Sequence, residues 1–291
     1  MRLIRSALYV PGNSAKMLQK ARAVSADALL LDLEDAVSAA GKDEARALVV
    51  SAFSEPWPAD KAIFVRLNAL SSDIWERDLE SVLPCLPAGL VIPKVESAEQ
   101  VCLVDRKIAE VARATGVDAS DVALIAMLET ALGILRALEI ATASPRVCAL
   151  LLGSEDLTLD AGLQRTPEGL ELLYARSQTV FAATAAGIQT LDGVWADIAN
   201  LEGLRRESMR VRSLGFSGKS LIHPSHVPVV NEVFSPSQEE IERARRLVSA
   251  FAASESRGIG AISFEGQMVD RPHLEKARRL LRVAGEDLSE R

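Results

Sequence analysis

The sequence predicts a closed parallel (β/α)8 barrel, an α/β fold, followed by a C-terminal helical extension. Strand-like apolar runs alternate with helix-like segments, eight such runs fit into about 225 residues, and nothing resembling a hairpin precedes residue 257. Strands that alternate with helices indicate βαβ units and therefore a parallel sheet. Eight units of this length match a closed barrel better than an open doubly wound sheet.

Each predicted strand is a short apolar run of the kind found in buried parallel strands. The runs lie at residues 7–10, 28–33, 62–67, 89–93, 122–128, 147–152, 187–191 and 218–222. Between them, apolar residues recur at helical spacing, which predicts helices at about 14–24, 42–53, 74–82, 97–115, 130–141, 168–186 and 197–213. The catalytic barrel domain is therefore expected to cover residues 1–234.

Residues 235–291 are expected to form C-terminal helices and a lid or arm. A Ser-Pro-Ser sequence at 235–237, followed by two glutamates, is typical of a capped helix start, and this helix should end near Ser254. The stretch at 257–272 contains three glycines but is too apolar for a solvated tail. We expect it to pack on the protein, as a lid or as an arm across a neighbouring subunit.

The composition argues against several classes of protein. A formal charge of −7 does not suit a sequence-independent nucleic-acid surface. No apolar run approaches the ~20 residues needed to cross a bilayer, and no signal-peptide hydrophobic region is seen, so the expected compartment is the cytoplasm. Cys85, Cys102 and Cys148 have no metal-ligand spacing and are expected to be core thiols without disulfides.

Two carboxylates give the clearest sign of chemistry. Glu129 directly follows one predicted strand, and Asp156 follows the next one. Because adjacent parallel strands lie about 5 Å apart, acids at their carboxyl ends can bind one hard cation, at the end where barrels carry their chemistry. Either acid could instead cap the following helix, and Glu155 competes with Asp156 for the same place. The pair predicts a metal-assisted enzyme.

Other charged residues are predicted at the same end of the barrel. Asp32, Glu34 and Asp35 follow the second strand, and their mutual repulsion calls for a cation, an arginine or backbone donors. Arg66 ends the third strand, where a buried guanidinium needs a partner, and its planar fork suits a carboxylate or an oxyanion. We expect the acids, Glu34 included, to orient Arg66 or metal-bound water. Asn68 either assists there or turns the chain.

Two further segments are weaker candidates. A Pro-Gly turn at 11–12 presents backbone N–H groups suited to an anion, and Lys16 nearby either binds phosphates or faces solvent. The last strand segment is not a P-loop, because its first glycine is misplaced. Lys219 within that strand needs a partner, and His223 and His226 are acid–base candidates or simply capping and core residues.

Short motifs follow one another along almost the whole chain. They are Arg5-Ser with Leu8-Tyr-Val-Pro-Gly12; Asp32-Leu-Glu-Asp-Ala-Val37 with Lys42 and Ala45-Arg46; Val65-Arg66-Leu-Asn68; Ile92-Pro-Lys94-Val-Glu96; Glu129-Thr130; Gly153-x-x-Asp156-Leu; and Gly218-Lys219-x-x-Ile-His223-Pro224. In this order they resemble the citrate lyase beta-subunit-like family, which includes malyl-CoA and citramalyl-CoA lyases of the HpcH/HpaI aldolase superfamily. One departure is His226, where many relatives carry Gln.

The resemblance implies a TIM barrel that is usually a homotrimer. It implies that Glu129 and Asp156 hold Mg²⁺, while Arg66 binds and polarises the oxygens of the 2-oxo acid. In CoA-lyase relatives the C-terminal arm crosses to a neighbour and supplies an acid. Asp270 is therefore the implied acid/base in trans, although it could also cap the last helix.

The implied reaction is a reversible Claisen-type cleavage of a 3-hydroxyacyl thioester, such as malyl-CoA or citramalyl-CoA, to acetyl-CoA and a 2-oxo acid. Asp270 would protonate the acetyl-thioester enolate, so its pKa is expected above the free value of about 4. Arg5 and the loop near Lys16 would lie toward the pantetheine arm. Two alternatives remain: a citrate lyase beta subunit that acts on a citryl group bound to an acyl-carrier protein, and a metal-dependent acyl-CoA thioesterase.

Overall fold

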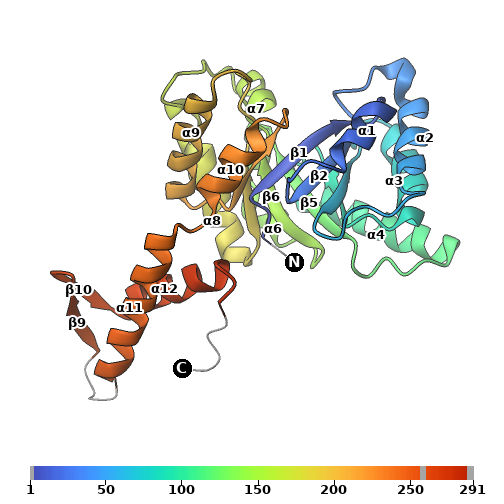
Figure 1. Cartoon of the computed structure of the whole chain (residues 1–291). Helices are drawn as coiled ribbons and strands as arrows, with labels where there is room; N and C mark the ends of the chain where they lie inside the picture. Colours follow the sequence, from blue (N-terminus) through green and yellow to red (C-terminus); the bar gives the residue numbers. More distant parts are fainter. Residues whose placement is uncertain (1–2, 256–259, 287–291) are drawn as a thin grey trace. The chain divides into compact units, whose positions relative to one another are not determined.

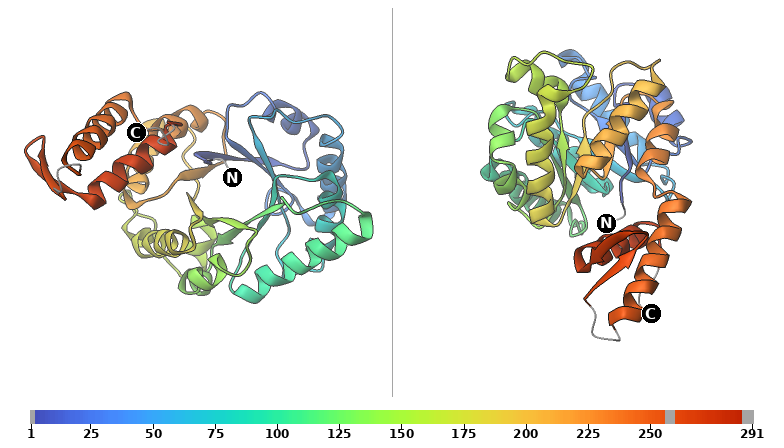
Figure 2. Two further views of the ribbon diagram at one scale, coloured as in Figure 1. Left: turned by 90° about the horizontal axis from the view of Figure 1, so that it is seen from below. Right: turned by 90° about the vertical axis from the view of Figure 1, so that its left-hand side faces the viewer.

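The computed structural model describes residues 3–255 and 260–286 and confirms the predicted barrel. Eight parallel strands pair in sequence order, and the last strand pairs with the first (Figures 1 and 2). The strands are β1 (Ser6–Pro11), β2 (Ala28–Asp32), β3 (Ala62–Arg66), β4 (Gly89–Ile92), β5 (Ala123–Leu128), β6 (Val147–Leu152), β7 (Gln189–Asp192) and β8 (Gly218–Leu221). Each of them coincides with one of the predicted apolar runs.

The two faces of each strand serve two different cores, which explains why the runs are continuously apolar. On β2, Leu30 packs inside the barrel with Phe64 and Ile125, whereas Leu29 and Leu31 pack outward among the residues of the surrounding helices. All five of these side chains are fully buried. The barrel interior is thus filled by side chains, and chemistry is left to its ends.

Helices surround the ring of strands (Figure 2). They are α1 (Ala15–Ala21), α2 (Lys42–Ala52), α3 (Ile74–Val82), α4 (Ala98–Thr115), α5 (Ala131–Leu135), α6 (Ala137–Ala141), α7 (Ser154–Asp160), α8 (Leu173–Ala186), α9 (Leu201–Leu214) and α10 (His226–Phe234), with short 3-10 turns η1 (Ala39–Gly41), η2 (Leu83–Cys85) and η3 (Leu170–Leu172). No helix in the described ranges is both long and apolar enough to cross a membrane.

The helices differ from the sequence prediction in three places. The helix expected at 130–141 is two helices, because Arg136 between them leaves the helical region (φ −102°, ψ 15°). The short helix α7 was not predicted. Nor was α10, which carries Pro228 near its start; proline is tolerated there because the first turn needs no N–H donors.

The chain from Ser235 onward forms a second compact unit. Its first helix, α11 (Gln238–Glu255), starts where the sequence predicts it. Ser237 Oγ accepts the N–H of Glu240 at 3.1 Å, and the Glu240 carboxylate accepts the N–H of Ser237 at 2.8 Å. This reciprocal capping satisfies two otherwise free donors at the helix start.

The stretch predicted as an arm contains an antiparallel hairpin of β9 (Ala261–Phe264) and β10 (Gln267–Asp270), followed by α12 (Arg271–Val283). Residues 257–259 of that stretch lie outside the described residues. Val269 is buried against the helices of this unit, whereas Met268 is exposed, although we expected the whole stretch to pack on the protein. The period-two alternation of a strand sends these neighbours to opposite faces.

The three cysteines, Cys85, Cys102 and Cys148, are free thiols, as predicted. All three are half-buried rather than fully enclosed. Cys148 packs against the inner core of the barrel, and burial raises the pKa of its thiol to about 12. A thiol in that state is a poor nucleophile, which agrees with a packing role.

Candidate active site

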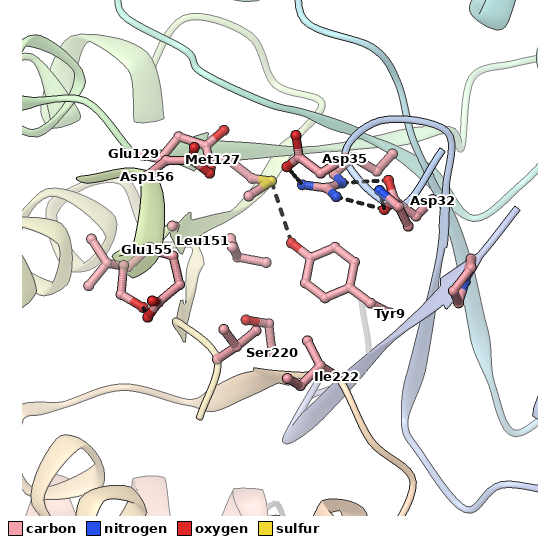
Figure 3. A pocket seen from close by; sticks show the side chains of 17 residues that line it. Tyr9, Asp32, Asp35, Met127, Glu129, Leu151, Glu155, Asp156, Ser220 and Ile222 are labelled. Carbon is pink, nitrogen blue, oxygen red and sulfur yellow. Dashed lines mark hydrogen bonds and ion pairs between the residues drawn. The ribbon is translucent and has the colours of Figure 1, made fainter. Parts of the chain in front are cut away.

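A cavity of about 420 Å³ opens at the carboxyl ends of the barrel strands. This is the end at which parallel barrels carry their active sites. Its polar lining includes predicted site residues from four different strands or the loops behind them (Figure 3): Asp32, Asp35, Arg66, Glu129, Glu155 and Asp156. The remaining lining comes from Tyr9, Pro11, Ala36, Met127, Leu151, Leu152, Gly153, Ser154, Val194, Ser220 and Ile222.

Glu129 is a buried acid with one oxygen unsatisfied. Its Oε1 accepts the backbone N–H of Lys94 at 2.7 Å, whereas its Oε2 has no hydrogen-bond partner in the described part of the chain. Burial, together with the negative charges of Glu34 and Asp156, raises the pKa of Glu129 to about 8. A cation placed at Oε2 would remove the cause of this rise.

Gly153 makes room for the Glu129 carboxylate. A Cβ atom on Gly153 would lie only 2.3 Å from Glu129 Oε2, much closer than any non-bonded contact allows. The main chain at the end of β6 therefore forms one wall of the space around this oxygen. A glycine at such a position indicates close approach of backbone and functional group.

Asp156 lies beside Glu129 at this wall, as Figure 3 shows. It belongs to the first turn of α7, but the helix has no side-chain cap, and Gly153 occupies the N-cap position. The competing acid, Glu155, is exposed and pairs with Arg165 at 2.8 Å. The capping explanation for Glu129 also fails, because Thr130 caps α5.

Arg66 is held by the acids that follow β2. Its Nε and Nη2 donate to the two oxygens of Asp32, both at 2.7 Å, and its Nη1 lies 2.9 Å from Glu34 Oε2. Nη1 also donates to Asp35 at 3.1 Å. The bidentate pair fixes the plane of the guanidinium. Burial raises the pKa of Glu34, and the charges of Arg66 and Lys94 oppose that rise.

Tyr9 places its hydroxyl within the pocket. Its ring lies under the Arg66 guanidinium, with the carbon of that group 4.8 Å from the ring centroid, a cation–π arrangement. Within the described residues, the hydroxyl donates one hydrogen bond, to the thioether of Met127 at 3.6 Å, which is a weak acceptor (Figure 3). Burial raises the pKa of Tyr9, so the group stays a neutral donor.

The residues fit a hard divalent cation bound by few protein ligands. Glu129 offers an unpaired buried oxygen, Asp156 offers a half-buried carboxylate, and both line the cavity. No cluster of three or more metal-binding side chains occurs among the described residues. Mg²⁺ keeps several waters and uses one or two carboxylates plus substrate oxygens, so this donor set suits it.

Two predicted substrate-binding residues are not brought to the cavity. Arg5 precedes β1 and pairs with Asp27, which precedes β2, through Nε and Nη2 contacts of 2.7 Å each. It lies at the amino ends of the strands and does not line the cavity, which argues against the expected contact with the pantetheine arm. Lys16, on α1, is exposed and does not line the cavity.

Asp270 caps α12 in the second unit. Its side chain accepts from the backbone of His273, and the His273 ring lies 2.6 Å from its Oδ1. This contact with His273 lowers the pKa of Asp270, so the expected rise is wrong for the isolated chain. A carboxylate in a capping box has its charge stabilised by helix donors and by its partner.

Lys219 finds its partners outside the barrel, in a second buried cluster. Its Nζ donates to Asp192 at 2.5 Å and to Glu207 at 2.7 Å, and Arg176 pairs with the same two acids. The two histidines near β8 do not line the pocket: His223 is exposed, and the ring of buried His226 meets a backbone carbonyl at 3.3 Å.

Sequence reasoning missed the role of Lys94 and the position of Tyr9, although both stand in motifs quoted for the resemblance. Lys94 directly follows Pro93 at the end of a strand, as Arg66 ends its own strand. That position was the available signal. Asn68 turned out to be structural, since its backbone and side-chain N–H groups donate to Asp78 at 2.9 and 2.6 Å.

Three characterised relatives resemble the chain over nearly its whole length. Citrate lyase subunit beta of Haemophilus influenzae is 39% identical over 290 residues, covering 100% of both chains. Human mitochondrial citramalyl-CoA lyase is 37% identical, covering 96% of this chain and 85% of its own. The (3S)-malyl-CoA thioesterase of Cereibacter sphaeroides is 36% identical, covering 96% and 94%.

A solved structure has the same fold. The CitE protein of Mycobacterium tuberculosis, in complex with magnesium, acetoacetate and coenzyme A, superposes with a TM-score of 0.80 and 35% identity, covering 98% of this chain and 99% of its own. Residues 5–224 also match the family model for HpcH/HpaI aldolase/citrate lyase. The chain therefore belongs to the HpcH/HpaI aldolase/citrate lyase family.

Proposed function

We propose that this protein is a Mg²⁺-dependent carbon–carbon lyase that cleaves a 3-hydroxyacyl-CoA thioester, such as malyl-CoA or citramalyl-CoA, to acetyl-CoA and a 2-oxo acid. The observation that carries the proposal is the Glu129 carboxylate, buried with one oxygen unpaired beside Asp156. Arg66 lines the same cavity and provides a fixed positive charge. The related lyases, and the CitE structure with magnesium and coenzyme A, support this reaction class.

The role of each group follows from its charge and position. Glu129 and Asp156 would hold Mg²⁺, and the bound metal would act as a Lewis acid that stabilises the oxygens of the 2-oxo-acid portion. Arg66, oriented by Asp32, would stabilise the hydroxyl oxygen as it becomes a carbonyl. Glu34 would help to orient Arg66 through its ion pair with Nη1 of the guanidinium. The Tyr9 hydroxyl would donate to a substrate oxygen that enters the pocket.

Proton transfer to the acetyl-thioester enolate is assigned to Asp270. This acid belongs to the second unit and caps α12, and the assignment rests on the family's arm acid rather than on contacts within this chain. In the capped state its pKa is lowered. Its use as a general acid would require that a neighbouring chain or the bound thioester changes this environment.

A self-associated enzyme, with a homotrimer as the expected form, would supply that neighbouring chain. The barrel exposes large apolar side chains on α5 and α8, two helices that contact each other. Leu135 is 62% exposed, Tyr174 63% and Phe181 72%. Exposed apolar groups gathered on neighbouring helices are typical of a protein–protein interface, and light scattering of the purified protein would measure the resulting mass.

The reaction is tested with purified protein, Mg²⁺ and a panel of CoA thioesters that includes malyl-CoA and citramalyl-CoA. Release of acetyl-CoA together with glyoxylate or pyruvate is the expected result and names the substrate. Asp156→Asn is the matched inactive control, because it keeps the shape of the ligand but removes its charge. No cleavage of any ester would contradict the proposal for free CoA substrates.

Two alternatives have specific support. The 39% identity to citrate lyase subunit beta favours a chain that works with an acyl-carrier protein and further subunits. The 36% identity to a malyl-CoA thioesterase favours hydrolysis in the same pocket. The assay separates them: hydrolysis yields free CoA and intact malate, whereas a carrier-dependent subunit cleaves a citryl group only on its carrier.

A further inference from the structure

Lys94 holds an unusual backbone conformation at the edge of the pocket. Its φ is +52°, and Leu86 and Glu265 are the other non-glycine residues of the described chain with positive φ. A side chain in the left-handed region costs about 1–2 kcal/mol, and such a residue persists only where its surroundings hold it. The contacts that Lys94 makes with its neighbours should therefore account for its positive φ.

Two contacts from this one residue reach two different acids. The backbone N–H of Lys94 donates to Glu129 Oε1 at 2.7 Å, and its Nζ donates to Glu34 Oε1 at 2.7 Å. Both acids are buried, with 1% and 5% exposure. φ sets how the side chain is turned relative to the residue's own N–H, so the positive φ lets the amide face Glu129 while Nζ reaches Glu34. Nζ also lies 3.9 Å from the more exposed Asp35, and the shorter Glu34 contact is the one that can hold this φ in place.

The two acids belong to opposite halves of the site. Glu129 is the candidate metal ligand, and its Oε2 is left without a partner once Lys94 holds Oε1. Glu34 lies 2.9 Å from Arg66 through its other oxygen. A single residue thus connects the metal side of the pocket with the arginine side.

We propose that Lys94 is a positioning residue that aligns the metal ligand Glu129 with Arg66. Its left-handed amide sets the carboxylate of Glu129, and its ammonium group sets Glu34 and, through Glu34, the guanidinium. The Glu34 contact stabilises the left-handed backbone on which the Glu129 contact depends. The inference deepens the proposed lyase function and rests on it for the value of the alignment.

Two substitutions at Lys94 separate the amide from the ammonium group. Lys94→Ala removes the Glu34 contact but keeps the cost of a left-handed side chain, so the backbone should relax and release Glu129. Lys94→Gly removes the same contact but adopts positive φ without that cost. The amide should therefore still hold Glu129 in the glycine variant, while Glu34 and Arg66 lose their support in both.

The readouts are metal affinity and turnover at one fixed pH. Mn²⁺ serves as the probe. The EPR signal of the free ion gives its concentration in a titration, and added Mg²⁺ should displace bound Mn²⁺. The dissociation constant should rise about five- to thirtyfold in Lys94→Ala and stay within about twofold in Lys94→Gly, matching the left-handed penalty. Lyase turnover should fall about ten- to hundredfold in both variants, since small misplacements cost that much.

Leu86 provides the matched control. It also has positive φ, at 51°, but it precedes β4 and so lies at the other end of the strand from Lys94, with its side chain 48% exposed. Leu86→Ala and Leu86→Gly should change neither metal affinity nor turnover. With a chelator present to remove metal ions, urea unfolding should give a lower free energy of unfolding for Lys94→Ala than for wild type. Leu86→Ala should match wild type.

Equal metal affinity in the alanine and glycine variants, or a Lys94→Ala protein as stable as wild type, would overturn the inference. Failure of the proposed function has a different signature. If the wild-type protein binds Mn²⁺ but cleaves no thioester, the proposed lyase function is wrong. The metal affinities of the two Lys94 variants then still test the positioning role of Lys94. If wild type binds no Mn²⁺, the urea comparison with Leu86 decides it.

Discussion

The barrel contains two clusters of charged side chains that differ in how well positive charges compensate the buried acids. The pocket cluster consists of Asp32, Glu34, Arg66, Lys94 and Glu129. The outer cluster, between β7, β8, α8 and α9, consists of Arg176, Asp192, Glu207 and Lys219. Both are built from the same residue types. Asp32, Arg66 and Glu129 of the first cluster line the cavity at the strand ends, and no residue of the outer cluster belongs to its lining.

The outer cluster is balanced, with two acids and two bases. Each acid contacts both bases, and the positive charges, led by Lys219, hold the pKa values of Asp192 and Glu207 below their ordinary ranges against the effect of burial. In the pocket cluster the acids outnumber the bases, and burial raises the pKa values of Glu129 and Glu34.

The difference teaches how to tell a structural charge cluster from a functional one. Burial alone does not distinguish them, because every member of both clusters except the half-buried Lys94 is buried. The direction of the acid pKa shift does, because the cations outweigh burial in the outer cluster, whereas burial outweighs the cations in the pocket cluster. Among the described residues, Glu129 Oε2 is a buried oxygen of the pocket cluster without a hydrogen-bond partner.

Glu129→Gln should give the largest effect and sharpens this distinction. The variant should lose measurable Mg²⁺ binding and about a thousandfold or more in turnover, because a metal contributes several kcal/mol to such transition states. It should fold at least as stably as wild type in chelator, because the raised pKa shows that burying the charge is unfavourable. Turnover within tenfold of wild type would contradict the ligand role.

Lys219→Met should show the opposite pattern. It leaves Asp192 and Glu207 with Arg176 alone, and breaking a buried ion network costs about 3–5 kcal/mol. Urea unfolding should show this loss, while the Mg²⁺ affinity of the folded protein stays unchanged. If the variant does not fold, the milder Glu207→Gln carries the same test. A loss below 1 kcal/mol would show that the outer cluster is dispensable.

Arg66→Lys tests the guanidinium geometry within the pocket. Lysine keeps the charge but cannot make the bidentate contact with Asp32, so turnover should fall about a hundredfold. Metal affinity should change little, because Arg66 is not a ligand. Arg176→Lys in the outer cluster is the matched control and should leave kcat intact.

The free energy of unfolding should depend on pH with opposite sign in the two clusters. This is the smallest of the expected effects. The folded pKa of Glu129, about 8, exceeds its ordinary value of 4.5, so the folded state binds the extra proton and stability falls as pH rises between these values. From pH 6 to pH 7, wild type in chelator should lose about 1 kcal/mol relative to Glu129→Gln. Saturating Mg²⁺ should abolish the difference.

For the outer cluster the sign is reversed. The pKa values of Asp192 and Glu207 are lowered, so their contribution is present above the ordinary range of these acids and is lost as pH falls through their folded values. Acid unfolding of Glu207→Gln should therefore be shallower than that of wild type below about pH 4. An identical acid limb in both proteins would contradict this assignment.

The barrel was predictable because buried parallel strands and amphipathic helices leave strong periodic signals. The elements that the sequence missed are short or contain unusual residues, such as α7 and Pro228 in α10. The β9–β10 hairpin depends on a turn at Glu265 and Gly266, both with positive φ. In the sequence, Gly266 alone does not indicate whether the chain turns back in a hairpin or continues as an extended arm.

The site was partly predictable for a related reason. Acids and Arg66 at strand ends must converge in a barrel, so Glu129, Asp156 and Arg66 were found from position alone. Lys94 was missed because the positioning role proposed for it depends on the sign of φ, which no side-chain pattern reveals. Arg5 was misplaced because it stands one residue before its strand, at the wrong end.

Gly153 shows that part of this site is built from main chain rather than from side chains. The space beside Glu129 exists because one residue lacks a Cβ atom. Copying the two acids and the arginine into another barrel would therefore not transfer the metal site, since any larger residue at this position of a foreign loop would displace the Glu129 carboxylate. Gly153→Ala, a change of one methyl group, should close the site while every charged residue remains.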